Sequence, residues 1–124
     1  EIMALTHVDV DKDVQTALDR QKANVALYVG GMGHKEKNFH KDNMVRRGFG
    51  DAAERIQELF LGGAKEEAIA AVPDEWIDLK SIVGPPERIK QRYRAWENSG
   101  ATGLIMWPAQ NEAVDVMAEA ARLN

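Results

Sequence analysis

The densest group of side chains that could do chemistry lies between residues 34 and 47. Two imidazoles stand there among five lysine and arginine side chains, and these cations could attract an anionic cofactor tail or a substrate phosphate. Interspersed acidic residues dilute the positive charge, and basic runs of this composition more often form solvated surface. The basic members of the segment are His34, Lys35, Lys37, His40, Lys41, Arg46 and Arg47.

Three glycines, Gly30, Gly31 and Gly33, come immediately before this basic segment. Successive backbone amides in a glycine-rich turn can cradle a phosphate. The run matches neither the Walker pattern nor the dinucleotide-binding fingerprint, because both need a strand before the glycines and a helix pattern precedes them here. A helix C-cap followed by a flexible turn is therefore the simpler interpretation.

The histidines do not suggest a metal site. His34 and His40 are six residues apart, which suits neither one face of a helix nor a zinc pattern, and the chain has no cysteine. His7 lies on a separate predicted strand and would join them only through the fold. We expect no metal.

Trp107 stands at the end of the most apolar predicted strand of the chain. In parallel α/β barrels the carboxyl ends of the strands and the loops after them build the active site, so an aromatic residue there could stack on a flat ring. Simple filling of a barrel end is an equally good explanation. The sequence shows no telling pair of carboxylates, no nucleophile elbow and no triad order, so the residues alone do not disclose a reaction.

Composition narrows the class of protein. The chain has 124 residues, a net charge of −4 and no cysteine, which fits one small domain in a reducing, cytoplasmic setting. The acidic balance argues against general nucleic-acid binding, and no apolar run approaches the roughly 20 residues that span a bilayer. The first residues lack the features of a signal peptide. The start on Glu1, inside a strand-like pattern, suggests a piece of something longer.

Hydrophobic periodicity predicts an α/β chain dominated by helices, with two or three short strands. The strands are expected at residues 2–10 and 103–107, and a short extended piece at 81–84. The segment 103–107 is apolar on both faces, as in a strand covered on both sides. The first helix is expected at residues 12–29 and ends on a left-handed cap at Gly30–Gly31. Further helices are expected at 39–47, from an N-cap at Asp51 to Gly62, at 64–72, after Pro73, from 86 to near 100, and at 112–123 with Leu123 inward.

Two short strands do not make a self-sufficient parallel sheet. Either this piece belongs to a barrel or it pairs with a second copy of itself. A barrel fragment would leave the apolar surfaces of Val8, Leu104 and Ile105 uncovered, together with unpaired strand edges. We therefore expect a homo-oligomer.

Read together and in order, a series of motifs resembles one family. The motifs are ALYVGGMG, NFH, VRRGFGDAAERIQELFLGG, AVPDEWID, SIVGPPERI and AWENSGATGLI. They resemble the C-terminal portion of the luciferase-like monooxygenase superfamily, and within it the oxidoreductases that use the deazaflavin coenzyme F420. The resemblance covers nearly the whole chain, and it rests on the series because each motif alone is weak.

The resemblance implies a (β/α)₈ barrel, which needs roughly 250 residues, so the chain would be its last third. Residues 2–10 would be the seventh barrel strand, 103–107 the eighth, and 30–80 a helical insertion. The family's catalytic residues would lie on earlier strands and are unknown here. The residues that could contact cofactor or substrate are Thr6, His7, Gly30, Gly31, Gly33, His34, Arg46, Trp107 and Gln110.

The implied activity is hydride transfer between F420, or alternatively FMN, and a small organic substrate. An isolated third of the barrel is expected to be inactive. A different class of function also stays open, in which the chain is a non-enzymatic helical module that associates with itself or with other subunits.

Overall fold

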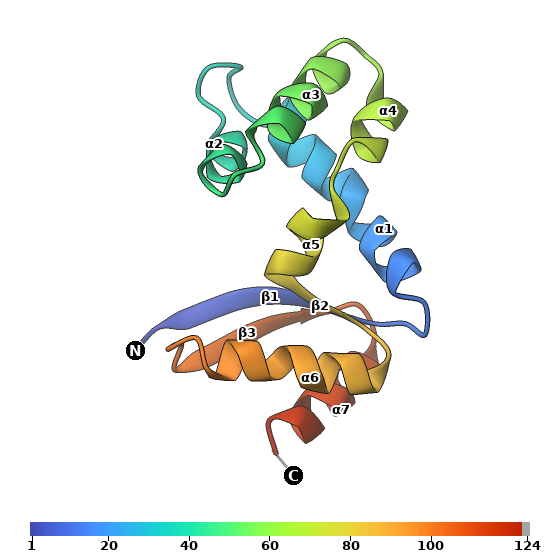
Figure 1. Ribbon diagram of the computed structural model, residues 1–124, viewed down its shortest axis with the longest axis vertical. Coiled ribbons are helices and arrows are strands. Elements are labelled where there is room, and N and C mark those ends of the chain that lie inside the picture. The colour runs from blue at the N-terminus through green and yellow to red at the C-terminus, as the bar shows by residue number, and fades with distance from the viewer. Residues whose placement is uncertain (123–124) are drawn as a thin grey trace. The chain divides into compact units, whose positions relative to one another are not determined.

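The computed structural model describes residues 1–122 and divides the chain into two compact units. The sheet unit comprises residues 1–18 and the chain from Asp78 onward, and the helical unit comprises residues 19–77. Figure 1 labels the α-helices and the strands of both units. Helices cover most of the described chain, as the periodicity predicted.

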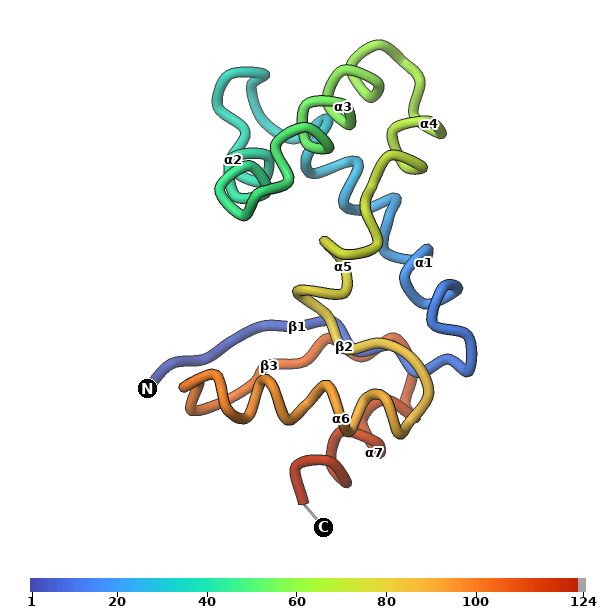
Figure 2. The backbone as a smooth tube through the Cα atoms, viewed as in Figure 1, coloured from blue at the N-terminus to red at the C-terminus, as the bar shows by residue number. Residues whose placement is uncertain are grey.

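Three parallel strands form the sheet: β1 (Met3–Val10), β2 (Ser81–Gly84) and β3 (Gly103–Pro108). Their order is β2-β1-β3, so β1 is hydrogen-bonded along both edges. In the backbone trace of Figure 2, β3 runs beside β1 although almost a hundred residues separate them in the chain. The segment expected only as a short extended piece is thus a true strand, and all four of its residues are buried.

One face of this sheet carries the core of the unit. Alternate residues of β1 point toward α6 (Pro86–Glu97) and α7 (Asn111–Ala120), because successive side chains of a strand project to opposite faces. Full burial of each large aliphatic side chain contributes about 1.5–3 kcal/mol. The cluster consists of Val8, Val10, Ile82, Ile89, Ala113, Val116 and Met117, with Tyr93, Trp96, Leu104 and Met106 packed against it.

The other face of the sheet is open toward its amino end. Leu5 and Ile105 are 55% and 51% exposed, and Met3 is also exposed. The expectation that strand 103–107 is covered on both sides is therefore wrong, because Ile105 and Trp107, on the face opposite Leu104, are exposed. Val8 is fully buried rather than uncovered, since it points into the helix-covered core.

The resemblance makes residues 2–10 and 103–107 the seventh and eighth strands of a (β/α)₈ barrel, and such neighbouring strands pair in parallel. The parallel pairing of β1 with β3 has this arrangement. Strand β2, which the resemblance does not count as a barrel strand, pairs with the other edge of β1. The described chain thus shows a small open parallel sheet, and membership of a barrel stays a proposal.

The helical unit is built from short helices. They are α1 (Val14–Ala26), which begins in the sheet unit, the π-helix η1 (Leu27–Gly31), α2 (Phe39–Arg46), α3 (Gly50–Leu61), α4 (Lys65–Ala70) and α5 (Asp74–Lys80), which ends in the sheet unit. Within residues 1–122, no helix combines the length and apolarity required to cross a membrane.

Several expected boundaries shift. The prediction of a left-handed cap at Gly30–Gly31 is wrong, because both glycines belong to η1. Of the three glycines in this run, Gly33 alone has a positive φ, of 86°. Helix α3 begins at Gly50 with Phe49 as N-cap, so Asp51 lies in the first turn instead of capping it. Helix α7 ends at Ala120, and the expected inward position of Leu123 lies outside the described residues.

Close packing explains the glycine pair. A Cβ built on Gly30 would lie 2.5 Å from Cβ of Phe60, and one on Gly31 would lie 2.4 Å from Cε1 of the same ring. The missing side chains therefore let η1 approach α3 closely. The buried side chains Val29, Met44 and Ile56 occupy the surrounding elements of this unit.

Candidate functional site

The carboxyl half of the sheet brings two predicted site residues together. His7 of β1 pairs in register with Trp107 of β3, and their rings stack with centroids 5.7 Å apart and planes 6° from parallel. Both side chains are exposed, and Trp107 is 61% exposed. The pair forms a flat aromatic surface on the face of the sheet opposite α6 and α7.

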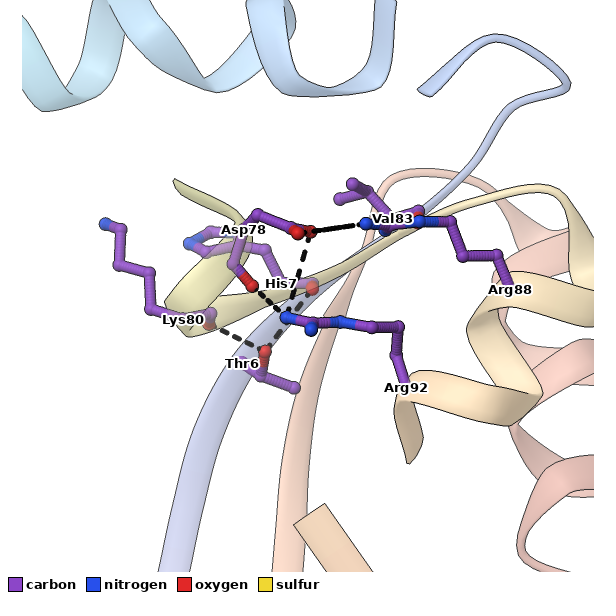
Figure 3. A network of polar contacts seen from close by, with 7 residues as sticks. All are labelled: Thr6, His7, Asp78, Lys80, Val83, Arg88 and Arg92. Carbon is purple, nitrogen blue, oxygen red and sulfur yellow. Dashed lines mark hydrogen bonds and ion pairs between the residues drawn. The ribbon is translucent and has the colours of Figure 1, made fainter. Parts of the chain in front are cut away.

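A lysine adds positive charge beside this aromatic surface. Lys80 comes directly before Ser81, which is the residue of β2 opposite His7. Figure 3 shows the imidazole of His7 and the side chain of Lys80 on the same side of the strands. Burial, and then the charge of Lys80, lower the pKa of His7 below its ordinary value of 6.5, while burial lowers the pKa of Lys80.

A polar network holds the end of α5 against α6, as Figure 3 shows. Nη2 of Arg88 donates to both carboxylate oxygens of Asp78, at 3.1 and 2.9 Å, and its Nη1 donates to the carbonyl of Val83 at 2.6 Å. Arg92 donates to the backbone carbonyl of Asp78. Charge-assisted, two-pronged contacts of this kind fix geometry as well as adding energy.

Thr6 belongs to this network and not to the aromatic surface. Its hydroxyl is buried and donates to the carbonyl of Lys80 at 2.9 Å. It thus ties β1 to the residue that precedes β2. The resemblance placed Thr6 among the ligand contacts, but its side chain lies on the opposite face of β1 from His7 and binds the backbone.

The side chain of Gln110 also forms hydrogen bonds to the sheet, at β1. Its Nε2 donates to Oδ1 of Asp9 at 2.8 Å and to the carbonyl of Val10 at 2.6 Å, while its Oε1 accepts from the amide of Val10 at 3.1 Å. These contacts lock the segment after β3 against the carboxyl end of β1. Gln110 therefore shapes the rim of the sheet.

The remaining predicted site residues all lie in the helical unit. Gly30 and Gly31 have helical surroundings, so they do not form a phosphate-cradling turn. His34 accepts from the amide of Glu36 through Nδ1 at 3.3 Å, and Arg46 donates to the carbonyl of Asp42 at 3.4 Å. These interactions are local. They do not gather the predicted residues into a common site.

Lys41, the most buried lysine of the basic segment, also has a structural role. Its ammonium contacts Oε1 of Gln57 at 2.7 Å and Oε1 of Glu54 at 2.8 Å. The neighbouring Asn38 donates to the carbonyls of Tyr28 and Val29 and accepts from the amide of Lys41. Among the described residues, no group of three or more histidine, cysteine or acidic side chains could hold a metal ion.

Sequence reasoning missed Lys80, Asp78 and Arg88. No local signal marks them, because the pairing of Asp78 with Arg88 spans ten residues and depends on the turn into α6. The position of Lys80 beside His7 depends on the register of β1 with β2. A parallel pairing between segments more than seventy residues apart leaves no trace in either segment alone.

The side chains of Trp107, His7 and Lys80 are suited to binding a ligand. An exposed indole beside an imidazole can accept a flat ring by stacking, and the nearby lysine favours an anionic group. A planar, negatively charged cofactor or substrate fits this donor set.

Comparison with known proteins agrees with the sequence motifs. The profile of the luciferase-like monooxygenase family matches residues 1–103. The Mycobacterium tuberculosis protein Rv3520c, whose name provisionally describes it as a coenzyme F420-dependent oxidoreductase, is 35% identical over 114 residues. That match covers 92% of this chain and 33% of the relative.

A solved structure shares the fold. Coenzyme F420-dependent tetrahydromethanopterin reductase from Methanopyrus kandleri superposes with a TM-score of 0.67 at 24% identity, over 95% of this chain and 33% of that protein. The chain thus spans about a third of the length of both relatives. By the extent of the family match, the chain belongs to the luciferase-like monooxygenase family.

Proposed function

We propose that the chain forms the C-terminal third of a coenzyme F420-dependent oxidoreductase that transfers hydride between the deazaflavin and a small organic substrate. The observation that carries this proposal is the 35% identity, over 92% of the chain, to a relative with that name. The structural likeness to a second F420-dependent protein supports the fold. Both names favour F420 over FMN, the alternative cofactor.

The deazaflavin, when bound, supplies a ring that accepts or donates hydride. The chain's own contribution is to receive part of the ligand at the carboxyl half of the sheet. Trp107 offers its exposed indole as a stacking surface, and His7 supports that indole from behind by ring contact. The network around Asp78 fixes the β2 side of this surface.

If the chain is one third of such an enzyme, we expect the isolated chain to be inactive. A (β/α)₈ barrel builds its active site from loops after all eight strands, and this chain would supply the seventh and eighth, β1 and β3. In the complete barrel these two strands would pair with each other, as they do here. The proposed insertion at residues 30–80 overlaps most of the helical unit, which comprises residues 19–77.

Fluorescence titration of F420 tests the cofactor proposal. A full-length protein that contains this chain should bind F420 at one site and prefer it to FMN, and Trp107→Ala should weaken F420 binding about tenfold by removing a stacking contact worth roughly 1–1.5 kcal/mol. Exposed Leu61 of the helical unit provides the control Leu61→Ala, which should bind normally. The 124-residue chain should bind weakly or not at all.

Two results would contradict the proposal. Preference of the full-length protein for FMN would overturn the cofactor assignment. A tight one-to-one complex between F420 and the 124-residue chain would show that a third of the barrel is sufficient.

We also propose that the isolated chain associates with copies of itself. The apolar residues Met3, Leu5 and Ile105 are exposed on one face of a parallel sheet, a type of sheet usually covered on both faces. The outer edges of β2 and β3 have no strand partner within the described residues. This association also serves the alternative, non-enzymatic function.

Sedimentation at micromolar concentration should show a dimer or a larger species, and Leu5→Thr with Ile105→Thr should shift the distribution toward monomer. The matched change Leu79→Thr, at another exposed leucine, should leave it unchanged. A stable monomer across dilution would contradict the association.

A further inference from the structure

A small cavity lies where α6 turns back into the sheet, at the amino end of β3. It has a volume of about 190 Å³, and its lining residues all belong to the sheet unit. In Figure 1 this turn lies at the end of the sheet where β1 begins, so Trp107 lies near the opposite end of β3. Pockets for drug-sized ligands measure roughly 300–1,000 Å³, so this cavity is suited to a smaller molecule.

Two aromatic side chains of α6 line the cavity. Tyr93 and Trp96 are three residues apart, so they lie on the same face of the helix. Both are half-buried and pack against the core of the sheet unit, and Leu104 of β3 lines the cavity beside them. The face of such a ring attracts a cation placed within about 6 Å of its centroid. The ring pair therefore favours a positively charged ligand.

The charge of the cavity has the sign that this preference needs. The carboxylate of Glu97 lines the cavity, and none of the described residues that line it is a lysine or an arginine. Glu97 is also the last residue of α6, and the C-terminal end of a helix carries a partial negative charge. Carboxylate and helix end thus act in the same direction as the two rings.

Arg94 gives an intramolecular example of cation binding at these groups. Its guanidinium carbon lies 5.9 Å from the centroid of the Tyr93 ring, and its Nη1 donates to Oε2 of Glu97 at 2.8 Å. The side chains of this ion pair are 42% and 45% exposed, and exposed pairs contribute little to stability. Oε1 of Glu97 has no partner among the described residues. A stronger cation can therefore replace Arg94 at little cost.

The strand side of the cavity is held by hydrogen bonds. The amide of Thr102 donates to the carbonyl of Ile2 at 2.9 Å, and the amide of Ile2 donates to the hydroxyl oxygen of Thr102 at 2.8 Å. At the end of α6, the hydroxyl of Ser99 donates to the carbonyl of Trp96 at 2.7 Å. Because these contacts already order the turn, a ligand need not supply that ordering when it binds.

We propose that the cavity binds a small organic cation of the quaternary ammonium class, such as choline. The methyl groups of the cation contact the rings of Tyr93 and Trp96, and Glu97 balances its charge. The ligand takes the place of Arg94 beside this carboxylate. The inference goes beyond the proposed oxidoreductase function and does not depend on F420.

NMR of the indole N–H groups in the 124-residue chain tests the inference. The chain has three tryptophans, and Trp96→Phe identifies the signal of interest. Choline should shift this signal in a saturable way, while the exposed Trp107 should keep its position. The neutral carbon analogue 3,3-dimethylbutan-1-ol has the same shape and should need about a tenfold higher concentration. A short peptide with one trimethyl-lysine carries the same cation, and the tighter of the two cations identifies the source of the ligand.

Charge variants at exposed positions connect the response to the cavity. Glu97→Gln should raise the half-saturating choline concentration about fivefold. Arg94→Gln should lower it about threefold, because it frees both the carboxylate and the Tyr93 ring. Lys90 of α6 and Glu119 of α7 form another exposed ion pair and do not line the cavity. The matched changes Glu119→Gln and Lys90→Gln should therefore bind choline as the unmodified chain does.

Four results would overturn the inference. Choline could leave the Trp96 signal in place, or the neutral analogue could bind as tightly as choline. An equal shift of the Trp107 signal would mean unspecific contact with exposed indoles. Unchanged or weaker binding in Arg94→Gln would show that this side chain does not compete for the site. The Trp107 signal also reports whether each variant keeps the fold of the sheet unit, and loss of F420 binding in the full-length protein would leave these measurements unaffected.

Discussion

The two units of this chain are stabilised in different ways. The helical unit packs the Gly30–Gly31 pair of η1 against Phe60 of α3, and the buried side chain of Asn38 donates to the backbone carbonyls of Tyr28 and Val29. The sheet unit packs one face on α6 and α7 and leaves apolar residues exposed on the other. The helical unit therefore depends on precise internal fit. The sheet unit depends on what lies beyond its edges and open face.

Substitution of Gly30 by alanine is the largest expected break in the helical unit. The new Cβ would lie 2.5 Å from Cβ of Phe60 and 3.3 Å from the carbonyl of Ile56, so α3 must move away. We expect a loss of about 3 kcal/mol in the free energy of unfolding, measured by urea denaturation. The matched change Gly50→Ala meets only Val45 at 3.8 Å and should stabilise by about 0.5 kcal/mol.

The second test asks whether Gly31 is needed because of the Phe60 ring or because of its own backbone conformation. In Gly31→Ala the clash is with the Phe60 ring, so the additional change Phe60→Leu should recover part of the loss. The double-mutant cycle should give a coupling of about 1 kcal/mol. Additive losses would show that the glycine pair is needed for backbone freedom and not for space.

Asn38 is the next target, since it joins η1 to α2. It is buried, donates to the carbonyls of Tyr28 and Val29 at 3.1 and 2.8 Å, and accepts from the amide of Lys41 at 2.9 Å. Asn38→Ala should cost about 2 kcal/mol, because buried carbonyls lose their donors. Asn38→Asp keeps the helix cap and should be no better, since a carboxylate cannot donate to those carbonyls. Normal stability of Asn38→Asp would assign the whole effect to the cap.

Local patterns predicted the elements of this chain better than their ends. The period of β1 and of the main helices follows directly from the spacing of apolar residues, and those segments are confirmed. The Gly30–Gly31 pair was misjudged because glycine after a helix usually marks a cap. Its true cause is Phe60, thirty residues further along, and no local pattern encodes that distance.

The candidate site shows the same limit. The resemblance named His7, and the position of Trp107 at a strand end suggested stacking, but only the sheet register makes the two rings neighbours. Lys80 and its supporting network were not predicted, since their contacts cross from α5 to β1 and α6. The pairing of β1 with β3 agrees with the seventh and eighth strands that the resemblance implies. The place of β2 at the other edge of β1 was not predicted, because strand order depends on which edges are available for pairing.

Thr6 offers a smaller test, in the sheet unit. Its buried hydroxyl donates to the carbonyl of Lys80, and Thr6→Val removes that donor while preserving the shape of the side chain. We expect a loss of about 1 kcal/mol in the free energy of unfolding. The hydroxyl of Thr16 is exposed and donates to Oδ2 of Asp13, so Thr16→Val should change stability by less than about 0.5 kcal/mol. Equal losses in both variants would exclude a special role for the β1–β2 tie.

The smallest expected effect is a pH dependence that only the sheet unit should show through His7. Burial and the charge of Lys80 lower the pKa of His7 in the folded chain, so between that pKa and 6.5 the unfolded chain binds more protons. The free energy of unfolding must then rise with pH across this window, reach its full value above pH 6.5, and fall as the pH drops through the window.

Urea denaturation between pH 5 and 8 measures this dependence, and the free energy of unfolding should change less with pH in His7→Gln. Lys80→Gln should also reduce the slope, by removing one cause of the shift, while Lys90→Gln should preserve it. A slope of equal size in all four proteins would place its origin outside the row of side chains formed by Trp107, His7 and Lys80.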